Sequence, residues 1–181
     1  MIAEKIYTYE DYLKKEERVE LINGEFYDMS PSPYPKHQRV VSRLWHELFR
    51  NLDCKNSEKE DKCEVYISPI DWKIDDRNVV QPDVAIFCEE TDKQYFSKTP
   101  PVVVEVLSKA TAKKDISVKY ELYERNGVKY YLIVDPNNEI ADIFKLKNDK
   151  FELIGKLSRD KEIELEWDGC KSKIDFKNVY N

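Results

Sequence analysis

The sequence predicts an α/β or α+β fold in which helices flank a mixed sheet. Two runs rich in valine and isoleucine, Val80–Phe87 and Val102–Leu107, are typical of strands that are buried on both faces. A third run of this kind, Lys129–Asp135, follows a segment with helical periodicity at Asp115–Asn126. Buried strands separated by an amphipathic helix favour a sheet that is covered by helices.

Composition narrows the class of protein. The chain has 181 residues, 41% hydrophobic and 12% aromatic, which favours one folded domain over residues 1–181 and excludes a disordered chain. Its net charge of −6 gives no general attraction to nucleic acid, so DNA binding would require a local basic patch. No apolar run approaches the ~20 residues that a membrane span needs.

The spacing of the four cysteines bears on their redox state and on metal binding. Cys54, Cys63, Cys88 and Cys170 are far apart in the chain and show no CxxC or other zinc-binding spacing. The sequence also shows no signal peptide. We therefore expect reduced thiols in a cytoplasmic protein.

The first elements of the chain are a short helix and a hairpin. Thr8 is a plausible N-cap for a helix within Ile6–Glu17. The Asn-Gly pair within Arg18–Met29 indicates a β-hairpin, because both turn positions need a positive φ angle. Glu20 lies in the first strand of this hairpin, where the simplest interpretation is a side chain that faces solvent.

A longer helix is expected over His37–Leu52, where apolar residues recur every three or four positions on one face. His37 begins that buried face. A lone histidine in such a position is more often a core or capping residue than a metal ligand.

Two carboxylates and one lysine stand out against these elements. Asp83 lies in the first buried run and Glu105 in the second, and a buried carboxylate is costly unless a positive charge holds it. Placing the helix Asp115–Asn126 at 100° intervals puts Lys119 on its apolar face. These residues predict a cation site, although a buried pair between Glu105 and Lys119 could equally hold the helix on the sheet without catalysis.

The remaining segments indicate further short strands or a meander. Gly127 fits the end of the preceding helix. The expected strands are Glu64–Ile70, Asp71–Ile74, Glu139–Leu146, Phe151–Ile154, Glu162–Trp167 and Ile174–Phe176.

Together these segments resemble the PD-(D/E)xK nuclease superfamily and, within it, the Uma-two (Uma2) family of restriction endonucleases. The resemblance is carried by VELINGEFYDMSPSP with His37, VQPDVAIF, PPVVVEVLSKAT and DISVKYELYERNGVKYYLIVDP. Pro82-Asp83, followed 22 residues later by Glu105, matches the first two motif positions. The resemblance implies a restriction-endonuclease-like core with an extra N-terminal hairpin and additional C-terminal strands.

The sequence departs from the superfamily pattern at Leu107, which stands where the motif lysine is expected, two residues after Glu105. Lys109 comes two residues too late, whereas Lys119 matches the place where the resemblance puts the lysine of this family. The first strand and first helix of this fold border the cleft, which implies that Glu20 and His37 approach the catalytic site.

The function implied by the resemblance is metal-dependent hydrolysis of DNA phosphodiester bonds by an endonuclease. Asp83 and Glu105 would hold Mg²⁺ or Mn²⁺, which prefer oxygen ligands, and Lys119 would stabilise the transition state. The candidate DNA contacts are Lys109, Lys113 and Lys114.

Alternatives stay open at this point. A catalytically inert nuclease fold used for dimerisation or nucleic-acid binding fits the acidic net charge and the small basic patch. RNA would use the same residues as DNA. Twelve tyrosines and the strands after Pro136 also suggest a homodimer.

Overall fold

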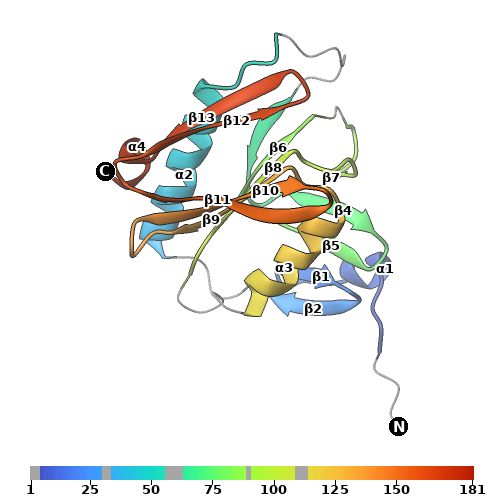
Figure 1. The fold of residues 1–181 in the computed structure, drawn as a ribbon. Helices are drawn as coiled ribbons and strands as arrows, with labels where there is room; N and C mark the ends of the chain where they lie inside the picture. Colours follow the sequence, from blue (N-terminus) through green and yellow to red (C-terminus); the bar gives the residue numbers. More distant parts are fainter. Residues whose placement is uncertain (1–4, 30–33, 56–62, 89–90, 109–113) are drawn as a thin grey trace.

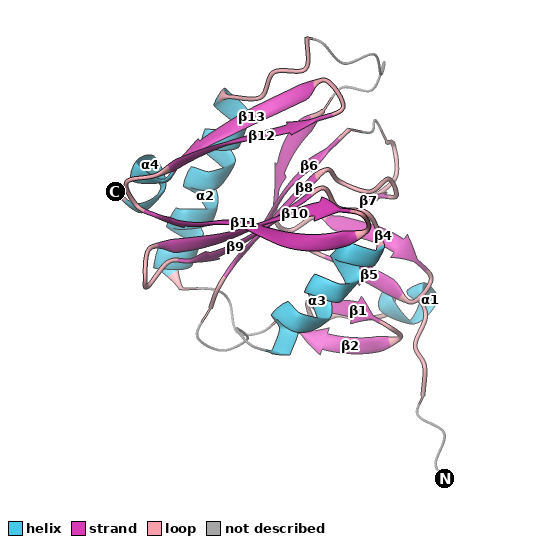
Figure 2. Cartoon of the chain, in the orientation of Figure 1, coloured by secondary structure: helices cyan, strands magenta, loops and turns pink. Residues whose placement is uncertain are grey.

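The computed structural model describes residues 5–29, 34–55, 63–88, 91–108 and 114–181, and Figures 1 and 2 show their arrangement. The helices of these residues are α1 (Tyr9–Tyr12), α2 (Pro35–Arg50), α3 (Lys114–Arg125) and α4 (Phe176–Tyr180). The strands are β1 (Val19–Ile22), β2 (Glu25–Asp28), β3 (Glu64–Ile67), β4 (Asp71–Asp75), β5 (Asn78–Val80), β6 (Val84–Phe87), β7 (Tyr95–Phe96), β8 (Val102–Val106), β9 (Tyr130–Asp135), β10 (Ile140–Lys147), β11 (Lys150–Ser158), β12 (Glu162–Trp167) and β13 (Cys170–Asp175).

A six-stranded mixed sheet forms the centre of the fold, in the order β11-β10-β9-β8-β6-β3. Strands β8 and β9 are parallel, as expected for two strands joined through a helix, and the other neighbours are antiparallel. A five-stranded sheet has the order β2-β1-β5-β4-β7, and β12 and β13 form a separate hairpin.

Each face of the central sheet has its own core. Helix α2, the β12–β13 hairpin and α4 pack on one face, and α3 packs with the five-stranded sheet on the other (Figure 1). Along β8, Val102, Val104 and Val106 belong to the first core and Val103 to the second. Alternation along the strand therefore points Glu105 towards α3.

The structure confirms the predicted mixed α and β architecture and moves several boundaries. Helix α1 is shorter than the expected Ile6–Glu17, and the end of the chain continues as α4 where a strand was expected to reach Phe176. No helix among the described residues is long and apolar enough to cross a membrane.

One correction concerns the run Val80–Phe87, which is not a single strand. Its first residue ends β5 in the five-stranded sheet, and Val84 begins β6 in the six-stranded sheet. Pro82 lies at the crossing, where its missing N–H is incompatible with a continuous central strand. Asp83 therefore lies in the connection just before β6 rather than within a strand.

The expectation of reduced thiols is also wrong for this structure. Cys54 is joined to Cys170, and Cys63 is joined to Cys88, in two disulfides. The sequence separations of 116 and 25 residues hid this proximity, because strand pairing and helix packing bring the four segments together.

Candidate functional site

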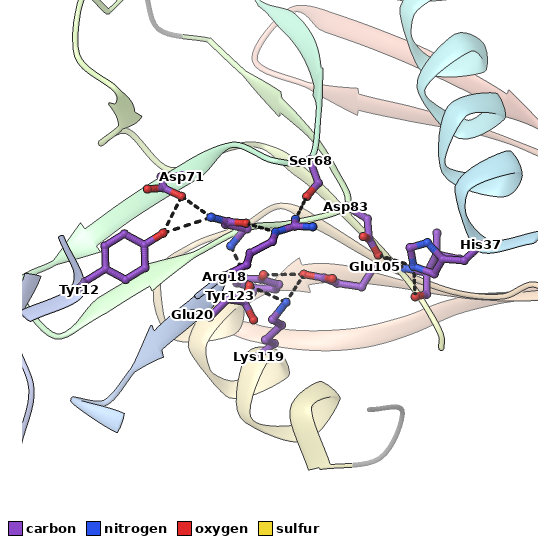
Figure 3. A network of polar contacts seen from close by, with 12 residues as sticks. Tyr12, Arg18, Glu20, His37, Ser68, Asp71, Asp83, Glu105, Lys119 and Tyr123 are labelled. Atoms are coloured by element: carbon purple, nitrogen blue, oxygen red, sulfur yellow. Dashed lines mark hydrogen bonds and ion pairs between the residues drawn. The ribbon is translucent and has the colours of Figure 1, made fainter. Parts of the chain in front are cut away.

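The structure gathers the predicted site residues where β6 begins and β8 ends (Figure 3). Glu105 comes from β8, Lys119 from α3 and Glu20 from β1. Asp83 immediately precedes β6, and His37 lies in the first turn of α2. The side chains of Glu105, Lys119, Glu20 and His37 are buried, and the Asp83 side chain is 19% exposed.

Lys119 binds two carboxylates at once. Its Nζ atom lies 2.8 Å from Glu20 Oε1 and 3.0 Å from Glu105 Oε1. Burial alone would lower the pKa of Lys119, but the charges of Glu105 and Glu20 outweigh it and raise that pKa above its usual value. The ammonium group is therefore charged throughout the ordinary pH range. The two contacts show that the lysine on the apolar face of the helix has negative partners.

Glu105 experiences the opposite balance. Burial raises its pKa to about 7, and Asp83 and Glu20 act in the same direction, while Lys119 and a 2.8 Å hydrogen bond from the Tyr123 hydroxyl act against it. One ammonium group thus compensates incompletely for the negative charge in this buried region.

Asp83 and His37 form the second part of the site. Asp83 Oδ2 accepts a 2.8 Å hydrogen bond from the Val106 N–H and lies 3.3 Å from His37 Nε2. His37 Nε2 also lies 3.0 Å from the Val106 carbonyl oxygen, so Nε2 must carry a hydrogen to donate there. Burial lowers the pKa of His37, but Asp83 outweighs this effect and raises it above the usual value.

Glu20 corrects the simplest sequence interpretation, which had its side chain facing solvent. The residue is 4% exposed, because β1 lies between β2 and β5 and its side chain points towards α3. Glu20 Oε1 accepts a 2.7 Å hydrogen bond from the Gln81 N–H as well as the contact from Lys119. Alternation could not reveal this, since all four residues of β1 are buried.

The donor atoms fit a hard divalent cation. The described side-chain contacts of Asp83 use Oδ2 and those of Glu105 use Oε1, which leaves Asp83 Oδ1 and Glu105 Oε2 for a ligand. Glu20, Glu105 and Asp83 place three carboxyl groups around the single ammonium group of Lys119. Oxygen ligands and surplus negative charge are the features that Mg²⁺ and Mn²⁺ require.

Sequence reasoning missed three neighbours of the site. Tyr123 packs in the core on the apolar face of α3, yet its hydroxyl donates to Glu105. The Gln81 side chain accepts from the Nε atom of Arg18 at 2.8 Å and donates to Asp71 at 2.8 Å. Arg18 is exposed and also donates to Ser68, so a cation borders the site on the solvent side (Figure 3). In the sequence, the position of Gln81 as a polar residue inside an apolar run, directly before Pro82, could have drawn attention to it.

The predicted nucleic-acid contacts are not placed by the structure. Lys109 and Lys113 lie outside the described residues, and Lys114 begins α3, its side chain being outside the description.

Comparisons with known proteins agree with this architecture. Residues 4–167 match the model of the Uma2 family, described as "Putative restriction endonuclease". An uncharacterized protein of Synechocystis sp. is 30% identical over 174 residues, which cover 92% of this chain and 88% of the relative. A crystal structure of a putative nuclease belonging to DUF820 from Anabaena variabilis matches with a TM-score of 0.72 at 14% identity, covering 96% of this chain and 97% of the other.

Proposed function

Because the chain belongs to the Uma2 family, described as putative restriction endonucleases, we propose that it is a metal-dependent endonuclease that hydrolyses DNA phosphodiester bonds. One observation carries the proposal. The loop before β6, strand β8 and helix α3 contribute Asp83, Glu105 and Lys119 to one largely buried, negatively charged cluster. An ordinary structural ion pair would need only Glu105 and Lys119.

Asp83 and Glu105 would hold the metal, through the oxygen atoms that their protein contacts leave available. A bound Mg²⁺ or Mn²⁺ would polarise the phosphodiester and acidify a water molecule. The protein's own contribution is to fix both carboxylates: the Val106 N–H orients Asp83, and Lys119 and Tyr123 orient Glu105.

Lys119 would supply the positive charge for the transition state. An ammonium group has three hydrogens, and Glu20 and Glu105 account for two of them. The third hydrogen could be donated to a phosphate oxygen or to the attacking water. In this proposal Glu20 is a positioning residue, because it reaches the reacting atoms only through Lys119.

His37 would also act as a positioning residue. It contacts both Asp83 and the Val106 carbonyl, and so joins α2 to the ends of β6 and β8. When protonated, it places a positive charge beside Asp83 and would compete with the metal there.

The test is cleavage of single-stranded DNA, double-stranded DNA and RNA by the pure full chain with Mg²⁺ or Mn²⁺. We expect metal-dependent cleavage of DNA that Asp83→Asn abolishes. Asp142→Asn is the matched control, since Asp142 lies in β10 and pairs with Lys156 away from the site. Equal cleavage by wild type and Asp83→Asn would overturn the proposal.

Other outcomes would assign the fold to the alternatives. Cleavage of RNA alone would change the substrate. Mn²⁺ binding without cleavage of any nucleic acid, or no binding at all, would indicate the inert module. Whether the chain forms a homodimer stays a prediction, and light scattering at micromolar concentration would test it.

A further inference from the structure

All four cysteines of the chain meet in one cluster. The cluster lies at the end of β6 opposite to Asp83, because Cys88 directly follows the last residue of that strand. It is separate from the proposed nuclease site and shares no residue with it.

Backbone pairing brings the cysteines together, independently of any bond between sulfur atoms. Glu64 of β3 pairs with Phe87 of β6, so the residues just outside this pair, Cys63 and Cys88, are opposite each other. An isolated bridge between Asp53 and Lys171, with hydrogen bonds of 2.9 and 2.8 Å, likewise places Cys54 beside Cys170.

The two pairs also contact each other. The sulfur atoms of Cys63 and Cys170, which belong to different disulfides, are 3.7 Å apart. The sulfur atoms of Cys54, Cys63 and Cys170 all lie within 4.8 Å of one another. In a tetrahedral zinc site with Zn–S bonds of about 2.3 Å, neighbouring sulfurs are about 3.8 Å apart. Two independent disulfide cross-links would not require this proximity.

We propose that the reduced chain binds one Zn²⁺ through Cys54, Cys63, Cys88 and Cys170. A trialkylphosphine reduces each disulfide by taking an oxygen atom from water to become a phosphine oxide, and leaves two thiols. The four thiols then lose four protons as their sulfur atoms bind the ion. Two disulfides and one tetrathiolate site are thus alternative states of the same four residues.

Thiolate ligands select zinc over the magnesium or manganese of the proposed nuclease site. Four cysteines complete a tetrahedral shell, which is typical of a structural rather than a catalytic zinc site. The bound group would carry a net charge of −2. Lys98 and Lys129 line the cavity beside Cys63, Cys88 and Cys170, together with Asp168, which pairs with Lys129.

The ion would tie together parts of the fold that are far apart in sequence. Cys54 follows α2, Cys63 precedes β3 and Cys170 begins the β13 strand of the C-terminal hairpin. Zinc would therefore attach that hairpin to the edge of the central sheet, where β3 is the last strand.

The test uses the full chain, reduced with the phosphine in anaerobic buffer and titrated with Co²⁺ and then Zn²⁺. We expect the intense visible absorption of a tetrahedral cobalt–thiolate complex at one Co²⁺ per chain, and its loss when Zn²⁺ displaces the cobalt. Zinc should also protect all four cysteines from alkylation. Cys88→Ser should lower Zn²⁺ affinity by more than the 10–100-fold that loss of an outer-shell partner costs.

Glu105→Gln is the matched control. It removes a carboxylate of β8 that lies beside the start of β6, far from the cysteines, and it should retain the cobalt–thiolate absorption. Carboxylate-bound Co²⁺ lacks the sulfur-to-metal charge-transfer bands, so the two sites are distinguished by spectrum and the zinc proposal can fail without the nuclease proposal. The zinc proposal would be overturned if the reduced chain showed no cobalt–thiolate bands, whether or not it stays folded. It would also be overturned if Cys88→Ser bound Zn²⁺ with the affinity of the wild type.

Discussion

The two ends of β6 differ in the metal chemistry that their side chains allow. Asp83, at its start, belongs to the cluster of carboxyl groups, and Cys88, at its end, belongs to the cluster of cysteines. Five residues of extended chain separate them by about 17 Å. Hard and soft donors at the two ends would let one short strand serve two different ions without exchange between them.

The two clusters also differ in whether they carry charge that the fold must compensate. The carboxylates are buried between strands and helices, and the raised pKa of Glu105 records the incomplete compensation of their charge. The cysteines are neutral when they are paired, so their cluster needs no counter-ion in that state. The carboxylates at the start of β6 need a positive partner because they are buried. The cysteines at its end would carry charge only when their disulfides are reduced and the thiolates bind an ion.

Glu105→Gln changes only the carboxylate end of β6, and we expect it to have the largest effect of the substitutions considered, on DNA cleavage. Removing one of the two proposed metal ligands should lower DNA cleavage by about 10²–10³-fold, comparable to loss of a transition-state donor. Glu124→Gln, in the same helix α3 but outside the carboxylate cluster, where Glu124 pairs with Lys150, should cleave like wild type. Cleavage rates measured with saturating Mn²⁺ provide the comparison, and an active Glu105→Gln variant would contradict the assignment.

Lys119→Met should produce the next largest effect, on stability. Two buried carboxylates would lose their shared cation, so we expect the free energy of unfolding at pH 8 to fall by about 3–5 kcal/mol. The loss should be smaller at pH 5, where Glu105 takes up a proton. Urea unfolding at both pH values measures it.

Lys150→Met is the matched control, because Lys150 is an exposed lysine of β11 that pairs with the same helix. It should leave the unfolding midpoint unchanged. Equal effects of the two substitutions would show that burial of the Lys119 pair has no energetic consequence.

Mn²⁺ affinity should depend on pH at the carboxylate end. Glu105 must lose its proton to bind the ion, so affinity should fall about tenfold for each pH unit below its pKa of about 7. The pKa of His37 is also raised, and its protonation beside Asp83 acts in the same direction. Calorimetric titrations between pH 5 and 8 test this, and a pH-independent affinity would contradict it.

The same proton has a consequence for the metal-free chain. The folded state binds it more tightly than the unfolded state, because the pKa of Glu105 rises from 4.5 to about 7 on folding. The contribution of this group to stability is therefore complete below pH 4.5 and is lost as the pH rises towards 7.

Tyr123→Phe should have the smallest effect. It removes the hydrogen bond that holds the pKa of Glu105 down, so the midpoint of Mn²⁺ binding should move to higher pH, and stability should fall by about 1 kcal/mol. Tyr131→Phe is the control, since the buried Tyr131 hydroxyl has no hydrogen-bond partner among the described residues. An equal shift in both variants would exclude a specific role for Tyr123.

Much of the carboxylate end could be predicted from the sequence. Lys119 was identified by helical periodicity alone, because a charged residue on an apolar face is a local signal. Glu105 was identified because it is the single charged residue within a run of valines that is typical of a buried strand. The hydroxyl of Tyr123 and the N–H of Gln81 were not, since their partners are set by the packing of α3 and by the crossing between the two sheets.

The cysteine end could not be predicted. Zinc sites are usually recognised from pairs of cysteines a few residues apart, and here each cysteine comes from a different segment. Only the register of β3 on β6 and the bridge beside Cys170 bring them together. Both are long-range pairings, which one sequence does not encode in any local pattern.

The alternation along β8 has a consequence for insertions and deletions. Glu105 meets Lys119 on one face of the central sheet, while its neighbour Val106 meets His37 on the other. Adding or deleting one residue within β8 would exchange the faces and destroy the core and the carboxylate cluster together. Length changes in the connection between β6 and β7 would leave the register of β8 unchanged, so variation in length among relatives should concentrate there.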